Sequence, residues 1–446
     1  MSGQNPSSTE MVERGKYGSL VTEDSTKDMI DVDHDDYEKY GLARYSDHLK
    51  VEFFSLGFTA GISFQLLLIC IFLLFVSSYK EDIGPLNELS IEYFPTFRML
   101  FFFIFFFILY GLNLFIWRRY QIDYYSILDV TEEHSYQYVL RAVCSLAYIV
   151  FTCFLMYTLA VVGILPISKH LFPLLALIIP VMTYLSPFDK YMETCYGKHE
   201  QASQQRYDLI RNIGYILCAP FTHAKFIRTY ISDILCSMPK AFTDIIYTGC
   251  LYSNYDLNID IQTCPISGTF DYFITVTVFT SLPYFSRLLL CLRQYHESGV
   301  NKHLWNALKY FLSVGVTVLN AARQKTTGDT QQAFASMWFM VAIIATTYSM
   351  YWDYVHSWGL LNWSSKNFLL RDRLTFPKTY YYIAIIYNFC ARLVWAINLS
   401  PNQPFVAQNV VLLIGCAELT RRSMWSVLRI ENMHINKHPV ANQIKQ

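Results

Sequence analysis

The sequence lacks any excess of charge of one sign, since 35 Lys and Arg residues balance 35 Asp and Glu residues. A broad surface for nucleic acid needs a basic excess, so we predict no nucleic-acid partner. The sequence also lacks a Walker loop, a G-x-S-x-G motif, an H-E-x-x-H motif and a Rossmann glycine motif. We therefore predict that the chain is not an enzyme and that it needs no cofactor.

Metal-ligand patterns are missing as well. The eleven Cys residues form no C-x-x-C pair, and the His residues are dispersed. We expect no metal site, and we interpret most Cys residues as small core residues. Cys250 and Cys264 flank a loop that we predict to be non-cytosolic, where they could form a disulfide.

The beginning of the chain lacks an apolar run, so we expect no cleavable signal peptide. Residues 1–50 are polar and acidic, which predicts a disordered cytosolic tail. We predict a second, short cytosolic tail at residues 436–446.

Hydrophobic residues, by contrast, make up 53% of the chain. A helix of about 20 apolar residues crosses a bilayer. The sequence therefore predicts an all-α, polytopic transmembrane bundle of about ten spans at residues 51–435. Four predicted spans reach that length without one formal charge: Phe54–Ser78, Met99–Trp117, Ala142–Ser168 and Gln331–Trp352. The others are Leu171–Phe188, Phe226–Leu251, Asp271–Leu292, His303–Ala322, Thr379–Ser400 and Phe405–Leu428.

Lys and Arg gather in alternate loops, which predicts the orientation. The loop Ser357–Lys378 holds four basic residues, whereas Tyr252–Thr269 holds none. The even number of spans then places both termini in the cytosol. Asn362 matches the glycosylation pattern but falls in a predicted cytosolic loop, so we expect no glycan there. Between the spans, Asp189–Gln205 is predicted to be a polar loop, and Asn212–Phe221 a short re-entrant or broken helix.

Charged residues inside the apolar segments of the second half are the most informative feature. Arg392 lies between the uncharged stretches Thr379–Ala391 and Leu393–Ala417. A cation that faces lipid costs a few kcal/mol or more, so Arg392 is expected to face a bundle interior, a partner or a watery cavity. Asn388 and Trp395 share its helix face. A guanidinium beside an amide and an indole suits an oxyanion.

Glu418 precedes Arg421 and Arg422 by three and four residues, which puts its carboxylate against one or both guanidiniums. One Arg is then held in place while the other stays available for a ligand. Lys309 and Asp353 also lie in or beside apolar segments. With them, the charged residues of the second half comprise four cations (Lys309, Arg392, Arg421 and Arg422) and two anions (Asp353 and Glu418). This surplus of cations fits a phosphate-like ligand. The predicted phosphate-binding and translocation residues are Lys309, Tyr310, Asp353, Arg392, Trp395, Glu418, Arg421 and Arg422.

Structural roles remain open as alternatives. Arg421, Arg422 and Arg429 could form the positive-inside cap of the last span. Lys309 could extend from a helix end to the membrane surface. Asp353 could cap a helix, and Arg392 could form a purely structural pair with an Asp.

Longer motifs recur through the second half of the chain. They are Pro283-Tyr-Phe-Ser-Arg287, His303-Leu-Trp-Asn-Ala-Leu-Lys-Tyr310, Tyr351-Trp-Asp353 with Trp358-Gly-Leu360, Arg392 with Trp395, and Glu418 with Arg421-Arg422 and Arg429-Ile-Glu-Asn-Met-His434. These motifs resemble those of the EXS domain, and the resemblance covers about residues 51–435. This domain occurs in the xenotropic and polytropic retrovirus receptor phosphate exporters, the yeast SYG-type proteins and plant phosphate exporters.

The resemblance implies export of inorganic phosphate, with the anion near the residues already singled out. Two positions depart from the family pattern, because Asn388 and Ser357 stand where members usually carry acidic residues. Full-length exporters also carry an SPX domain that senses inositol pyrophosphates. Residues 1–50 are too few for it, so we expect a regulatory partner protein in its place.

We therefore predict a phosphate transporter in the plasma membrane or the Golgi membrane, which works without ATP. Short EXS proteins resemble a Golgi type that recovers phosphate released by glycosylation. The expected partners are inorganic phosphate and the lipid bilayer, and the expected assemblies include a homodimer. The alternative is a non-transporting Golgi membrane protein that retains or sorts resident proteins.

Overall fold

Helices form every regular element in the described part of the chain, which contains no strand. The computed structural model describes residues 57–58, 60–69, 93–130, 136–161, 163–185, 200–253, 272–394 and 408–437. The predicted all-α fold is therefore confirmed. The predicted tail at residues 1–50 and residues 438–446 lie outside the described residues.

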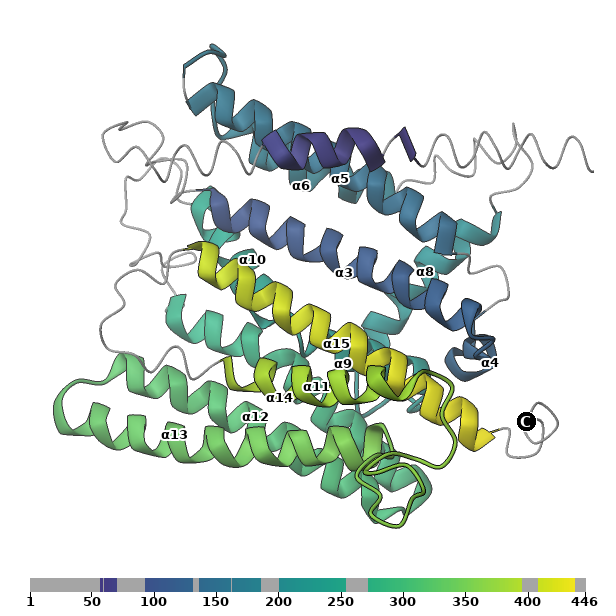
Figure 1. Cartoon of the computed structure of the whole chain (residues 1–446). Coiled ribbons are helices and arrows are strands. Elements are labelled where there is room, and N and C mark those ends of the chain that lie inside the picture. The colour runs from purple at the N-terminus through teal and green to yellow at the C-terminus, as the bar shows by residue number, and fades with distance from the viewer. Residues whose placement is uncertain are drawn as a thin grey trace, which may run out of the picture. The chain divides into compact units, whose positions relative to one another are not determined.

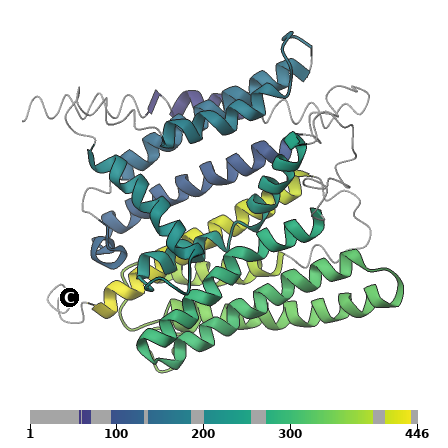
Figure 2. The same ribbon diagram turned by 180° about the vertical axis from the view of Figure 1, so that it is seen from behind.

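Helices of 5 to 30 residues make up the described part of residues 59–446, which form one unit, and the longer helices run side by side (Figures 1 and 2). They are α3 (Phe94–Arg119), α4 (Tyr124–Leu128), α5 (Tyr136–Val161), α6 (Leu171–Leu185), α8 (Glu200–Leu217), α9 (Phe226–Leu235), α10 (Pro239–Ser253), α11 (Tyr272–Ser298), α12 (Asn301–Lys325), α13 (Gly328–Tyr351), the π-helix η2 (Trp352–Ser357), α14 (Lys378–Leu393) and α15 (Gln408–Lys437).

Four of the described helices are long and apolar enough to cross a membrane: Phe94–Arg119, Val139–Val161, Ile274–Ser298 and Gly328–Ser357. The helix α3 illustrates why they form. Pro95 lies in its first turn, where a missing N–H is tolerated, and two Arg residues end it, where cations stabilise the helix dipole. The count of ten spans and the sides of the termini stay predictions.

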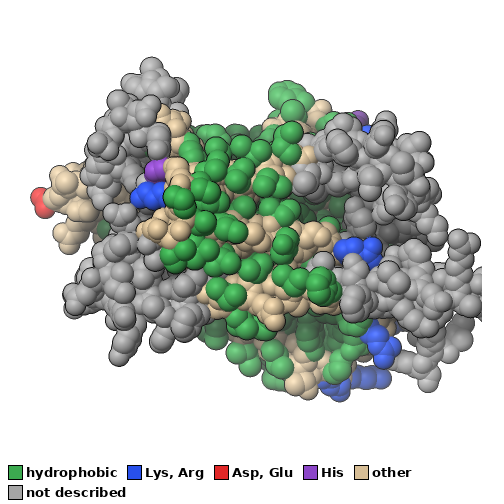
Figure 3. All heavy atoms as spheres, turned by 90° about the horizontal axis from the view of Figure 1, so that it is seen from above, with side chains coloured by type: hydrophobic (Ala, Val, Ile, Leu, Met, Phe, Trp, Pro, Cys, Tyr) green, Lys and Arg blue, Asp and Glu red, His purple; other side chains and the backbone are tan. Residues whose placement is uncertain are grey.

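One face of the described residues agrees with a membrane environment. Figure 3 shows hydrophobic side chains across its middle, with Lys and Arg towards its sides. Apolar side chains are stable against lipid, whereas charged side chains are stable near water.

Two predictions about the middle of the chain are wrong. The helix α8 begins at Glu200, so part of the predicted polar loop Asp189–Gln205 is helical. The segment Phe226–Leu251 is not one helix, because α9 ends at Leu235 and α10 starts at Pro239. Proline has no N–H to continue the hydrogen bonds of α9, and it suits the first turn of a new helix.

The helix α15 packs against α3, α14 and η2, and Figure 1 shows it between α3 and α14. Trp425 and Leu428 on α15 are almost fully buried, together with Trp117 from α3 and Trp358 after η2. The indole N–H of Trp358 donates to the carbonyl oxygen of Trp425 at 3.3 Å. These large side chains fix α15 against the end of the π-helix.

The loop between η2 and α14 is tied to α15 by the fully buried Glu431. Its carboxylate accepts hydrogen bonds from Arg371 Nη2 at 2.6 Å, from the Thr375 amide at 3.0 Å and from the Tyr381 hydroxyl. Within the loop, the Ser365 hydroxyl hydrogen bond holds the pKa of Asp372 below its ordinary value. The loop is therefore a folded segment that holds the end of η2 in place.

Candidate functional site

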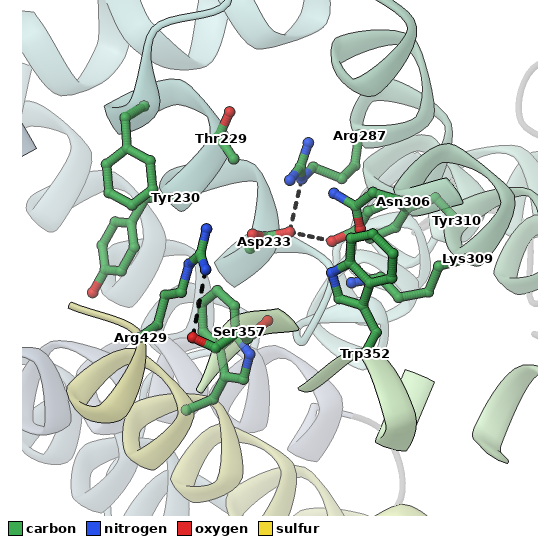
Figure 4. A pocket seen from close by; sticks show the side chains of 12 residues that line it. Thr229, Tyr230, Asp233, Arg287, Asn306, Lys309, Tyr310, Trp352, Ser357 and Arg429 are labelled. Carbon is green, nitrogen blue, oxygen red and sulfur yellow. Dashed lines mark hydrogen bonds and ion pairs between the residues drawn. The ribbon is translucent and has the colours of Figure 1, made fainter. Parts of the chain in front are cut away.

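A polar pocket lies among the helices of the second half. Side chains from α9, α11, α12, η2 and α15 meet there. The space between them that no atom fills, including the part open to solvent, is about 340 Å³. Figure 4 shows Asp233 between Arg429 on one side and Arg287 with Tyr310 on the other. The lining residues are Phe226, Thr229, Tyr230, Asp233, Arg287, Asn306, Lys309, Tyr310, Trp352, Ser357, Trp425 and Arg429.

Asp233 is the one carboxylate among these lining residues, and it is 5% exposed. Its Oδ1 accepts a hydrogen bond from Arg287 Nε at 2.7 Å and another from the Tyr310 hydroxyl. Arg287 also donates from Nη1 to the Cys291 sulfur at 3.0 Å. These contacts hold the guanidinium of Arg287 and the phenol of Tyr310 in fixed directions at the pocket wall.

The pocket holds more hydrogen-bond donors than its own acceptors satisfy. The Lys309 ammonium forms no hydrogen bond or ion pair with a described residue and lies 4.3 Å from the Tyr310 ring centroid. The buried Trp425 Nε1 also lacks a partner among the described residues. Arg429 Nη1 contacts only backbone carbonyl oxygens, those of His356 at 3.1 Å and Ser357 at 3.4 Å. Unpartnered buried donors favour a ligand that accepts hydrogen bonds.

A second cluster of charges, by contrast, is fully paired. Asp353 Oδ2 accepts from Arg392 Nη2 at 2.5 Å and Nε at 3.1 Å, and it lies 3.5 Å from Arg421 Nη1. Arg421 forms a bidentate pair with Glu418, at 2.6 and 2.7 Å, and donates to Asn388 Oδ1 at 3.1 Å. Two guanidiniums and two carboxylates therefore neutralise each other among the described residues of this paired cluster.

Lys309 and Arg422 connect the pocket to the paired cluster. Lys309 lines the pocket, and its ammonium lies 5.8 Å from the ring centroid of Trp352, the residue that precedes Asp353. Arg422 donates from Nε to the Ser237 hydroxyl at 2.7 Å and has no carboxylate partner among the described residues. The pocket and the paired cluster therefore lie close together among the helices, with a cation surplus on the pocket side.

Two irregularities of the backbone position these side chains. The break between α9 and α10 places Ser237 opposite Arg422, two residues after the end of α9, whose last turn carries Asp233. The π-helix η2 carries both Asp353 and Ser357, so its wide turn directs one residue to the paired cluster and the other to the pocket. Broken helices and π-bulges are common at functional sites.

The predicted site residues fall into three groups. Lys309 and Tyr310 line the pocket, whereas Asp353, Arg392, Glu418 and Arg421 form the paired cluster and Arg422 lies between them. The Glu418–Arg421 pair is the one that their spacing predicts. Trp395 lies outside the described residues. The roles of all these residues in binding an anion stay predictions.

Sequence reasoning missed several pocket residues as site residues, above all Asp233, Arg287, Asn306 and Arg429. Three of them belong to the motifs quoted above, but the apolar pattern alone gave no reason to bring them together. Pro239 predicts a helix break shortly after Asp233. This break was the signal that could have identified Asp233 as a site residue. The Cys250 thiol forms a disulfide, and its predicted partner Cys264 lies outside the described residues.

Comparison with known proteins gives one family. The EXS family model matches residues 93–435. The phosphate transporter PHO1 homolog 10 of Arabidopsis thaliana is 27% identical over 87% of this chain and 49% of its own length. The phosphate transporter PHO1 of the same plant is 26% identical over 86% of this chain and 48% of its own length.

An animal protein is similar over a smaller share of the chain. Solute carrier family 53 member 1 of Cricetulus griseus is 26% identical over 74% of this chain and 49% of its own length. The chain spans about half the length of the curated relatives that it matches.

Proposed function

The chain belongs to the EXS family, and on that premise we propose that it carries inorganic phosphate across a membrane. The observation that carries the proposal is the pocket, where Arg287, Lys309 and Arg429 face the single carboxylate of Asp233. Arg, Lys and an indole N–H are hydrogen-bond donors only, so they suit an oxyanion. The names of the plant relatives, which are phosphate transporters, support the same substrate.

The unequal pairing of the two groups of charges suggests how transport proceeds. The pocket offers unsatisfied donors, so a phosphate ion binds there without breaking an existing ion pair. In the paired cluster the anion must instead replace Asp353 or Glu418 as the partner of a guanidinium. We propose that this exchange of partners passes the ion along the path, with Lys309 and Arg422 between the two groups.

We propose that phosphate leaves the cytosol by facilitated movement and that the chain performs no covalent chemistry. At the plasma membrane the potential favours exit of an anion by about 2.3 kcal/mol per charge per 100 mV. Both the plasma membrane and the Golgi membrane are proposed locations, and a fluorescent fusion imaged with markers for each membrane distinguishes them.

Purified full-length chain in liposomes tests the function. Uptake of radiolabelled phosphate should exceed uptake by empty liposomes and should rise when the interior is made electrically positive. Lys309→Gln should reduce uptake, whereas Arg211→Gln, at a 65% exposed side chain on α8, serves as the control for loss of a cation. Uptake equal to that of empty liposomes, by protein that elutes as a single folded species, would falsify the proposal.

A further inference from the structure

The cation-rich pocket also contains acceptors without partners. Asp233 uses Oδ1 for both of its hydrogen bonds, and Oδ2 accepts none from a described residue. In Figure 4 the two dashed lines end on the same side of the Asp233 carboxylate. The second acceptor is Asn306 Oδ1, which is buried and has no hydrogen-bond partner among the described residues. Both residues line the pocket.

The amide of Asn306 is oriented by a neighbour. Its Nδ2 donates to the Cys291 sulfur at 3.3 Å, which leaves the carbonyl oxygen on the other side of the amide. Asn306 is 8% exposed, so bulk water does not satisfy that oxygen. A buried acceptor without a donor costs about 1–3 kcal/mol, and a charged acceptor costs more.

These acceptors distinguish between oxyanions of similar size. An ionised carboxylate accepts hydrogen bonds and donates none. Phosphate and arsenate carry at least one hydroxyl group at neutral pH and can donate it to Asp233 or Asn306. Sulfate and monofluorophosphate are tetrahedral dianions without a hydroxyl at neutral pH, so each would place an oxygen or a fluorine against an acceptor oxygen. A site with such an unmet hydrogen bond rejects the analogue strongly.

We propose that Asp233 and Asn306 make the pocket selective for oxyanions that carry a hydroxyl group. This inference rests on the proposed function, since it assumes that the pocket lies on the path of phosphate. The surplus of cations attracts any anion, and the two acceptors then decide which anion stays. Arsenate should therefore replace phosphate, whereas sulfate and monofluorophosphate should not.

Competition in liposomes tests the selectivity. Unlabelled phosphate and arsenate should inhibit uptake of labelled phosphate at similar concentrations. Sulfate and monofluorophosphate should need at least about 100-fold more. No phosphate uptake at all would contradict the proposed function. Phosphate uptake that sulfate or monofluorophosphate inhibits within about threefold of phosphate itself would contradict only this inference.

Two substitutions remove the acceptors separately. Asp233→Asn replaces the acceptor by an amide that can donate, and Asn306→Leu removes the acceptor at similar size. Each should reduce the preference for phosphate over monofluorophosphate about tenfold. Asn320→Leu is the matched control, because Asn320 lies on the same helix and its amide oxygen accepts from Arg323 away from the pocket. An unchanged preference in both pocket variants would overturn the inference.

The loss of transport in a variant does not prevent the test. Stabilisation of the detergent-solubilised protein by each anion then replaces uptake as the measurement. Equal thermal stabilisation of Asp233→Asn by phosphate and monofluorophosphate supports the proposal, whereas a retained preference for phosphate contradicts it. If the amide of Asn306 had the opposite orientation, its NH₂ group would face the anion. Asn306→Leu would then weaken the binding of all four anions equally, and that result would contradict a selective role for Asn306.

Discussion

The pair of Arg392 and Asp353 allows a transport role to be separated from a structural one. The Asp353 side chain is 2% exposed, and both donors of Arg392 contact one oxygen of its carboxylate. Removal of one partner from a buried pair costs about 3–5 kcal/mol, because the other charge stays buried. Arg421 remains 3.5 Å from Asp353, so we expect Arg392→Gln to cost about 3 kcal/mol of unfolding free energy.

The neutral double variant Arg392→Gln/Asp353→Asn should recover most of that stability. It leaves no buried charge without compensation at this pair, so the remaining loss should be about 1 kcal/mol. Phosphate uptake should nevertheless stay below about a tenth of the wild-type rate, since an amide cannot replace the charged, bidentate guanidinium. Thermal unfolding in detergent measures the first effect, and labelled phosphate uptake in liposomes measures the second.

A buried pair elsewhere in the bundle provides the control. Arg98 and Asp244 are each 1% exposed and lie 2.7 Å apart, between α3 and α10. The double variant Arg98→Gln/Asp244→Asn should keep most of its stability and also its phosphate uptake. Near-normal uptake by the Arg392→Gln/Asp353→Asn variant would refute the reasoning and make Arg392 a structural residue.

Three further predictions concern other residues. Lys309→Gln should raise the phosphate concentration for half-maximal uptake at least about tenfold, because its ammonium has no described carboxylate partner and is available to the anion; an unchanged value would remove Lys309 from the site. Asn362 should carry no glycan, so glycosidase should not change the mobility of the wild-type protein on a gel. Glu431→Gln should lower the unfolding free energy by about 3 kcal/mol, because Arg371 loses its buried counter-charge, and a thermal unfolding curve equal to the wild type would contradict this.

The sequence predicts the apolar helices well, because length and hydropathy determine them locally. The predicted span Met99–Trp117 lies within α3, and Gln331–Trp352 falls almost entirely in α13. Lys309 and Tyr310 were predicted as site residues and line the pocket. In such cases one charge in an apolar helix is enough to indicate a polar interior.

The remaining site depends on contacts between distant residues. Asp233 meets Arg287 across 54 positions of the chain, and Arg392 meets Asp353 across 39. No periodicity indicates which charges meet. The π-helix is equally hidden, because its wide turn is stabilised by tertiary contacts such as Arg429 with the carbonyl oxygens of His356 and Ser357. Arg429 was interpreted only as a family motif residue and as part of the positive-inside cap of the last span.

The paired cluster also has a consequence for biosynthesis. Arg392 lies in the last turn of α14, inside the predicted span Thr379–Ser400. An Arg costs up to about 2.5–3.5 kcal/mol when such a span is inserted into a bilayer alone. Asp353 is synthesised 39 residues before Arg392, and the two neutralise each other only when α14 lies beside η2. Arg421 and Glu418, by contrast, enter together on one helix. The helix α14 should therefore leave the translocon only when α13 and η2 lie beside it. The order of synthesis and the pairing of charges then together determine when α14 packs into the bundle.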